Sequence, residues 1–181
     1  MSEISPEIQK LIDERVQEAL KGAGVPQRKN RLALIASQGK LDAAYPPLII
    51  ASTAAAMEME TAIFFTFYGL YILHKKRGAN LQVPPIANPA MPIPMPNIIG
   101  MLPGMTPMAT MMMKSMFNKV KVPSIPELLE MCVDGGVRII ACQMTMDAMG
   151  IKKSDLIDGI EVGGAATFLG YASESSISMF M

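Results

Sequence analysis

Three short apolar runs, each followed by a segment of helical character, constrain the fold of this chain most strongly. They are "RLALIA" at residues 31–36, "TAIFFTF" ending at about Phe67, and "VRIIA" at residues 137–141. Apolar runs of this length without polar alternation are typical of strands buried on both faces of a parallel sheet. Strands that alternate with helices through short loops are joined by right-handed crossovers. With the brief segments "IEV" and "SISMF", the pattern predicts an α/β domain with a mainly parallel five-stranded sheet.

The first 28 residues stand apart from these runs. Residues 5–21 predict an amphipathic helix, because Ser5 is a suitable N-cap, Pro6 suits the first helical position, and Gly22 can end the helix. The linker "GVPQRKN" follows. We therefore expect an N-terminal helical arm and linker over residues 1–28, and one α/β domain over residues 29–181.

Charge and composition exclude several classes of protein. The 181 residues suffice for one well-packed domain, and the 16 basic residues balance 16 acidic ones. A nucleic-acid-binding protein would carry a basic stripe, so no nucleic-acid partner is expected. The start "MSEISPEIQK" lacks the basic and apolar regions of a secretory signal. This predicts a cytoplasmic chain whose thiols are reduced.

The sequence gives little support to a bound metal or cofactor. Two cysteines and one histidine, His74, cannot supply a four-ligand zinc site within one chain. The paired glycines in "DGGVR" and "EVGGAA" belong to neither a dinucleotide fingerprint nor a Walker motif. We expect neither a metal site nor a cofactor.

A Pro/Met-rich insertion at about residues 78–116 interrupts the α/β pattern. Residues 78–113 carry no charge and contain eight prolines, which rule out an uninterrupted membrane-spanning helix. Basic residues flank the insertion on both sides, an arrangement that could rest on an anionic bilayer surface. The reading we favour is an extended loop buried against another subunit, because methionine and proline pack well without donating hydrogen bonds. A Cu(I) surface built from thioethers is less favoured, since no histidine or cysteine is interleaved.

The two cysteines occupy different positions in the predicted fold. Cys142 ends the run "RIIAC", at the carboxyl end of a predicted parallel strand and directly before a helix. Ligands bind at this edge of open α/β sheets, and the first amides of a helix stabilise a thiolate. Cys132 shares one helical face with Ile125, Leu128 and Leu129, which predicts a buried core residue. We therefore predict Cys142 to be the reactive thiol.

The chemistry open to Cys142 needs a nucleophilic sulfur and no local base. Nothing in the sequence places His74 beside Cys142, and a Cys-x-x-Cys motif is absent. Two kinds of reaction stay open to Cys142: it can carry a persulfide or thiosulfonate, or it can react with peroxide.

Three segments resemble the DsrE/DsrF-like proteins of sulfur relay. They are "LALIASQGKLDAAYPPLIIASTAAAMEMETAIFFTFYGL", "GVRIIACQMTMDAMGI" and "LIDGIEVGGAATFL". The resemblance extends from about Asn30 to Phe180 and is nearest to the subgroup with an "ACQM"-type cysteine motif. It implies a flavodoxin-like three-layer sandwich that assembles into homo-oligomers.

The resemblance also implies a function. Members accept sulfane sulfur on a cysteine and pass it to TusA-like or rhodanese-like partners. The acceptor would here be Cys142, and Cys132 matches a second family cysteine by position, which makes it a candidate assisting thiol. The long insertion leaves partner choice and peripheral membrane contact through residues 78–116 open.

Two alternatives to a sulfurtransferase-like carrier stay open. A thiol peroxidase usually has a threonine three residues before its reactive cysteine, whereas Ile139 and Leu129 hold that place before Cys142 and Cys132. A non-catalytic oligomeric scaffold would use the methionine-rich loop as its contact surface and leave both thiols inert.

Overall fold

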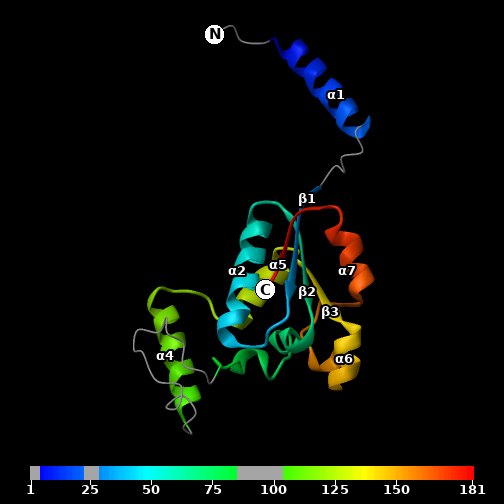
Figure 1. The fold of residues 1–181 in the computed structure, drawn as a ribbon. Coiled ribbons are helices and arrows are strands. Elements are labelled where there is room, and N and C mark those ends of the chain that lie inside the picture. The colour runs from blue at the N-terminus through cyan, green and yellow to red at the C-terminus, as the bar shows by residue number, and fades with distance from the viewer. Residues whose placement is uncertain (1–4, 23–28, 85–103) are drawn as a thin grey trace.

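A computed structural model describes residues 5–22, 29–84 and 104–181 and contains a five-stranded sheet in which every neighbouring pair is parallel (Figure 1). The strand order is β4-β3-β2-β1-β5. The strands are β1 (Lys29–Ala36), β2 (Glu60–Phe65), β3 (Arg138–Cys142), β4 (Glu161–Gly163) and β5 (Ser175–Phe180). The predicted number of strands and their parallel arrangement are confirmed.

Helices cover both faces of the sheet and give the domain three layers. The α-helices are α1 (Pro6–Gly22), α2 (Leu41–Ala56), α4 (Met105–Lys119), α5 (Ile125–Asp134), α6 (Gln143–Met149) and α7 (Ala165–Ala172). The 3₁₀ helices are η1 (Phe67–Ile72), η2 (Gly78–Asn80) and η3 (Lys153–Asp155). Helices α2 and α5 lie together on one face, and α7 lies on the other (Figure 1).

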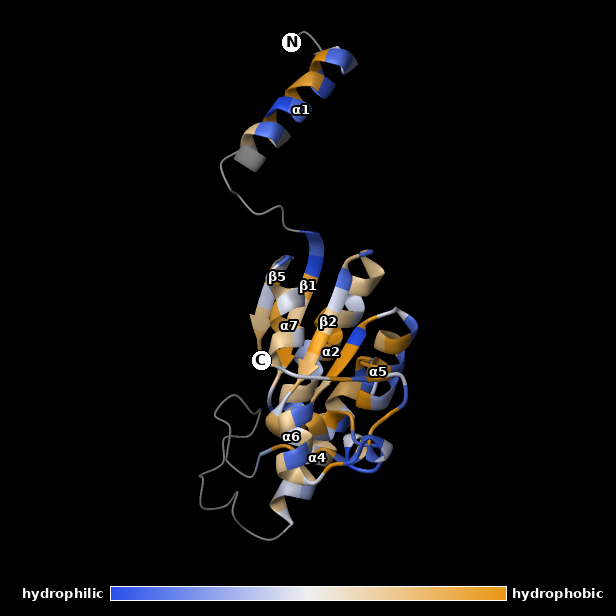
Figure 2. Cartoon of the chain, turned by 90° about the vertical axis from the view of Figure 1, so that its right-hand side faces the viewer, coloured by the Kyte–Doolittle hydropathy of each residue, from blue (hydrophilic) through white to orange (hydrophobic). Residues whose placement is uncertain are grey.

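Alternation along the strands divides the core between the two faces. Side chains such as Leu34 and Phe65 pack under α2 and α5 in the larger cluster. Their chain neighbours point the opposite way, and with Phe168 of α7 they form a smaller cluster. Figure 2 shows many hydrophobic residues in the strands of the domain, whereas the coloured part of α1 carries both hydrophilic and hydrophobic residues. Because successive residues of a strand face opposite sides, the register decides which face each side chain serves.

Helix α5 begins at a well-formed N-terminus that fixes the approach to β3. The main-chain N–H and the hydroxyl of Ser124 both donate to Oε2 of Glu127, at 2.6 Å each, and Pro126 lies in the first turn. These hydrogen bonds hold the pKa of the Glu127 carboxyl below its usual value. Gly136, at φ +73°, then turns the chain from α5 into β3.

Several element boundaries differ from the sequence-based expectation. Because proline suits the first turn of a helix, Pro46 and Pro47 predict a helix that starts at Tyr45. Helix α2 begins instead at Leu41, so both prolines lie inside it. Strand β2 ends at Phe65, and the chain continues as a 3₁₀ helix through Ile72. Within the insertion, residues 105–116 belong to helix α4 instead of an extended loop. Residues 85–103 of the insertion lie outside the described residues, and among the described helices none is both long and apolar enough to cross a membrane.

Candidate functional site

Cys142 lies where the sequence predicts it, at the carboxyl end of β3 and directly before α6. It is the N-cap residue of α6, with φ −69° and ψ 112°, so its backbone is still extended while the next residue is helical. At an N-cap the side chain points back toward the free main-chain N–H groups of the second and third helical residues. Those residues are Met144 and Thr145. As a thiol, Cys142 makes no side-chain capping hydrogen bond, so these two amides are donors that a thiolate at this position can use.

The wall around Cys142 is mostly apolar. Cys142 belongs to the smaller core cluster on the α7 face and is only 4% exposed. The rings of Phe64 and Phe168 stack in this cluster with their centroids 5.3 Å apart, and Ile140 precedes Cys142 on the same side of β3. Burial against such a wall disfavours a thiolate and by itself raises the pKa of the thiol.

Polar groups gathered at the sulfur reverse that effect. Burial is the largest single influence, yet the hydroxyl and amide of Thr145, the hydroxyl of Thr66 and the amide of Met144 together hold the pKa of Cys142 below its ordinary value. Hydrogen bonds to a charged form favour that form. No charged side chain of the described part of the chain is among these causes. The thiolate is thus favoured by neutral donors alone.

Thr66 directly follows β2, and Thr145 lies in the first turn of α6, which follows the neighbouring strand β3. Phe65 of β2 pairs with Ala141 of β3, so the next residue of each strand, Thr66 and Cys142, continue the register side by side. The hydroxyl oxygens of Thr66 and Thr145 lie 3.2 Å apart, and both side chains are buried. The main-chain N–H of Phe67 donates to Oγ1 of Thr145 at 3.2 Å.

Exposed apolar residues occur in the two segments that meet at Cys142 and Thr145. Phe67 and Tyr68, which follow β2, are 57% and 63% exposed, and Met144 of α6 is 66% exposed. We call these three residues the apolar rim. Large apolar side chains that are exposed together are typical of a surface that another protein covers.

Cys132 lies on the other face of the sheet. Its side chain is fully buried in the larger cluster, and its thiol donates to the carbonyl oxygen of Leu48 in α2 at 3.6 Å. Burial raises the pKa of Cys132 to about 11. Both cysteines are free thiols, and the structure does not bring them together.

The imidazole of His74 accepts hydrogen bonds from its own turn. Its Nδ1 accepts hydrogen bonds from the main-chain N–H groups of Lys76 and Arg77, at 3.1 and 3.4 Å. Within residues 5–22, 29–84 and 104–181, no three His, Cys, Asp or Glu side chains are grouped closely enough to hold a metal ion.

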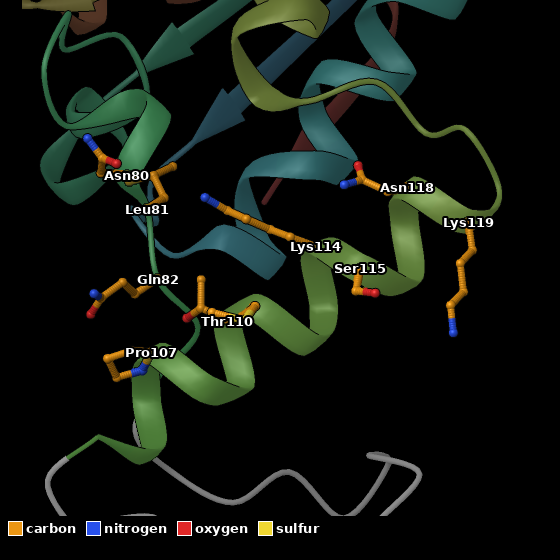
Figure 3. A pocket seen from close by; sticks show the side chains of 10 residues that line it. Asn80, Leu81, Gln82, Pro107, Thr110, Lys114, Ser115, Asn118 and Lys119 are labelled. Carbon is orange, nitrogen blue, oxygen red and sulfur yellow. The ribbon is translucent and has the colours of Figure 1, made fainter.

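A pocket lies between α4 and the segment around η2, on different elements from Cys142 (Figure 3). Lys114 extends from α4 toward Asn80 and Leu81, and its Nζ donates to the carbonyl oxygen of Ala79 at 3.3 Å. The side chains that line the pocket supply no thiol. Its lining therefore offers no nucleophile for sulfur chemistry.

Sequence reasoning located Cys142 and missed its polar partners. Thr145 follows Cys142 by three residues, which is the spacing of an N-cap residue and the third residue of its helix, so this contact could have been found. Thr66 and Phe67 follow β2, and only the register of β2 against β3 brings them beside Cys142 and Thr145.

Comparison with known proteins identifies the relatives of this chain. The model of the DsrE/DsrF/DrsH-like family matches residues 28–180. A protein of Allochromatium vinosum named sulfur carrier protein DsrE2 is 48% identical over 84% of this chain and 99% of its own length. The uncharacterized protein YrkE of Bacillus subtilis is 31% identical over 86% of this chain and 99% of its own length.

The fold also matches a solved structure. The crystal structure of the YchN protein from E. coli covers 83% of this chain and 98% of its own, with a TM-score of 0.53 and 14% sequence identity. At this identity the likeness concerns the fold alone, and it agrees with the parallel, three-layer architecture expected from the resemblance to the DsrE-like proteins.

Proposed function

The chain belongs to the DsrE/DsrF/DrsH-like family, and from this premise we propose that it is a sulfur carrier that accepts sulfane sulfur on Cys142 and passes it to a partner protein. The single observation that carries the assignment of the acceptor is the environment of Cys142. A thiol at a sheet edge, with donors that lower its pKa and with exposed apolar side chains beside it, suits a nucleophile that meets other proteins.

The proposed reaction is a sulfane sulfur transfer with no net oxidation. The Cys142 thiolate attacks the outer sulfur of a donor persulfide, a new S–S bond forms, and the S–S bond of the donor breaks. The donor leaves as its thiolate, and Cys142 carries the transferred sulfur as a persulfide. The reverse steps, with an acceptor thiolate attacking the outer sulfur, deliver the cargo. A thiosulfonate would load when the thiolate attacks tetrathionate, with thiosulfate as the leaving group.

The partners we propose are small sulfur-carrier proteins of the TusA-like or rhodanese-like kind. Each would present its own cysteine to Cys142, with the apolar rim of Phe67, Tyr68 and Met144 as the docking surface. We also propose that the chain forms a homo-oligomer and works in the cytoplasm, where thiols are kept reduced. The insertion at residues 78–116 would contribute to contacts between subunits, and peripheral membrane contact through the same residues is the alternative.

An assisting role for Cys132 has less support than a structural one. Its thiol is buried on the opposite face, with a raised pKa and a main-chain hydrogen-bond partner. The sheet lies between its thiol and Cys142. We therefore propose Cys142 as the acceptor and Cys132 as a packed core residue.

Intact-mass spectrometry after incubation with polysulfide or tetrathionate tests the proposal. We expect the reduced protein to gain one sulfur or one thiosulfonate group, Cys142→Ser to gain none, and Cys132→Ser to load like the wild type. Loss of loading in both variants would mean that both cysteines are required for sulfur loading. A folded wild type that stays unmodified would overturn the carrier and leave the oligomeric scaffold as the better account. Rapid consumption of peroxide in place of loading would favour the thiol peroxidase.

A further inference from the structure

We propose that Thr145 is a positioning residue for Cys142: its hydroxyl, held by the Phe67 amide and the Thr66 hydroxyl, donates the hydrogen bond that orients the thiolate for attack. The inference rests on the proposed function, because it concerns how the acceptor thiol is prepared.

The hydroxyl of Thr145 joins the first turn of α6 to the segment that follows β2. Thr145 is the third residue of α6, so its side chain and its amide both face the N-cap position held by Cys142. Its side chain is 3% exposed, which removes water as a competing partner. The hydroxyl must therefore find its partners among the protein groups around it.

Counting protons on the hydroxyls gives the direction of the hydrogen bonds. A threonine hydroxyl has one proton to donate and two lone pairs to accept with. The N–H of Phe67 fills one lone pair of Thr145 Oγ1, and the proton of Thr66, whose oxygen lies 3.2 Å away, can fill the other. Thr66 also has a single proton, which goes either to Thr145 or to the Cys142 sulfur. In both arrangements the Cys142 thiolate, which can only accept, takes the proton of Thr145. The hydrogen bonds therefore lead from the N–H of Phe67, after β2, to the hydroxyl of Thr145 and from this hydroxyl to the thiolate.

The backbone at Phe67 supports this direction. Phe67 has φ +46°, a left-handed conformation that is uncommon for an aromatic residue. Its side chain is more than half exposed, so packing of the ring does not compensate for the strain. What the conformation does achieve is to turn the Phe67 N–H toward Thr145. Strain of this kind is held where the surrounding structure uses it.

The test is the pH dependence of Cys142 alkylation by iodoacetamide in the full-length protein. Thr145→Val keeps the shape of the side chain and removes its proton, so we expect the pKa of Cys142 to rise. Alkylation at a pH below that pKa should then be slower, by about tenfold for each unit of the rise. Thr145→Ser restores the hydroxyl and should restore the wild-type profile. Thr66→Val should shift the profile in the same direction and by less, because the Phe67 amide still holds Thr145.

A matched control is Thr53→Val on the exposed side of α2. The Thr53 hydroxyl donates to the carbonyl oxygen of Ile49 at 2.7 Å, far along the chain from Cys142, so the substitution should leave the profile unchanged. If Thr145→Val does not fold, Thr145→Ala removes the same proton without adding a methyl group and takes its place.

Failure of this inference and failure of the proposed function give different results. A folded Thr145→Val protein with the wild-type pH profile would overturn the role of Thr145, whatever the protein carries. A wild type that shows the lowered pKa, loses it in Thr145→Val and yet never loads sulfur would overturn the carrier and leave the role of Thr145 standing.

Discussion

Cys132 and Cys142 lie ten residues apart in the sequence and on opposite faces of the same sheet. The intervening chain ends α5, turns at Gly136 and runs along β3, where Ala141 faces α2 and α5 and the next residue faces α7. The sheet thus separates a thiol whose pKa is raised to about 11 from one whose pKa is lowered. Burial under α2 and α5 and the hydrogen-bond donors around Cys142 therefore give the two cysteines of one chain opposite chemical character.

The first prediction concerns the relative reactivity of the two thiols. At pH 7.5 iodoacetamide should modify Cys142 at least about a hundredfold faster than Cys132, because each unit of difference in pKa changes the thiolate fraction about tenfold. Peptide mass spectrometry of a quenched time course measures both rates. In concentrated urea the two rates should become equal. Similar rates in the folded protein would contradict the opposite pKa shifts.

The second prediction concerns stability at alkaline pH. Cys132 has a pKa of about 11 in the folded protein, above its ordinary value of 9.0. Its contribution to the free energy of unfolding is therefore complete below pH 9 and is lost as the pH rises through 11. The unfolded state releases its proton first, which favours unfolding between these values. The difference in unfolding free energy between the wild type and Cys132→Ala should shrink by about 1 kcal/mol at pH 10 and by about 2–3 kcal/mol above pH 11.

Urea denaturation at pH 7, 9 and 10 gives this difference. Comparing it with Cys132→Ala cancels the other groups that titrate in this range, because both proteins contain them. A difference that stays constant with pH would mean that the Cys132 thiol ionises in the folded state as readily as in the unfolded one.

The third prediction concerns Gly69, which closes the turn after Thr66. Its N–H donates to the carbonyl oxygens of Ser37 and Thr66, at 3.0 and 2.9 Å, and a side chain there would collide with the carbonyl oxygen of Ala36. Gly69→Ala should therefore move the ends of β1 and β2 apart and cost about 2–3 kcal/mol of unfolding free energy. It should also slow the alkylation of Cys142, because Thr66 moves with this turn.

Gly170 in α7 is the control for that substitution. A side chain at Gly170 meets no atom within 4 Å, so Gly170→Ala should be neutral or stabilise the helix by about 0.5–1 kcal/mol. The thermal unfolding midpoint should fall in Gly69→Ala and should stay the same or rise in Gly170→Ala. Equal behaviour of Gly69→Ala and Gly170→Ala would contradict the close approach at Gly69.

The sequence predicted the parts of the fold that depend on local pattern. Runs such as residues 31–36 are apolar because helices cover both faces of the sheet. An apolar run of this kind therefore predicts a buried strand. The place of Cys142 follows from the same reasoning, because it ends such a run and the helical segment begins at the next residue.

What the sequence could not predict depends on contacts between distant segments. Thr66 reaches Cys142 only because β2 and β3 are neighbours in a particular register. Pro46 and Pro47 suggested a helix start, yet the helix begins at Leu41, since Leu41, Ala44 and Tyr45 pack into the core and outweigh two lost hydrogen bonds. Helix α4 was missed because its methionines and the neighbouring prolines suggested an extended segment.

The last prediction concerns the N-terminal arm. The side chains of Ile8, Leu11, Ile12 and Val16 in α1 are 43–63% exposed, so they contribute little buried apolar surface to the domain. The family model begins at residue 28, and β1 begins at Lys29, whose N–H and ammonium group both bond to Glu174. Removing residues 1–28 should therefore leave the thermal unfolding midpoint and the loading of Cys142 unchanged. A deletion that also removes residues 29–34 takes away most of β1, between β2 and β5, and should abolish folding. Circular dichroism melts and intact-mass loading distinguish the two deletions. A lower midpoint after the shorter deletion would mean that α1 packs on the domain, and the same melt with a lower oligomeric order in sedimentation would assign the arm to contacts between subunits.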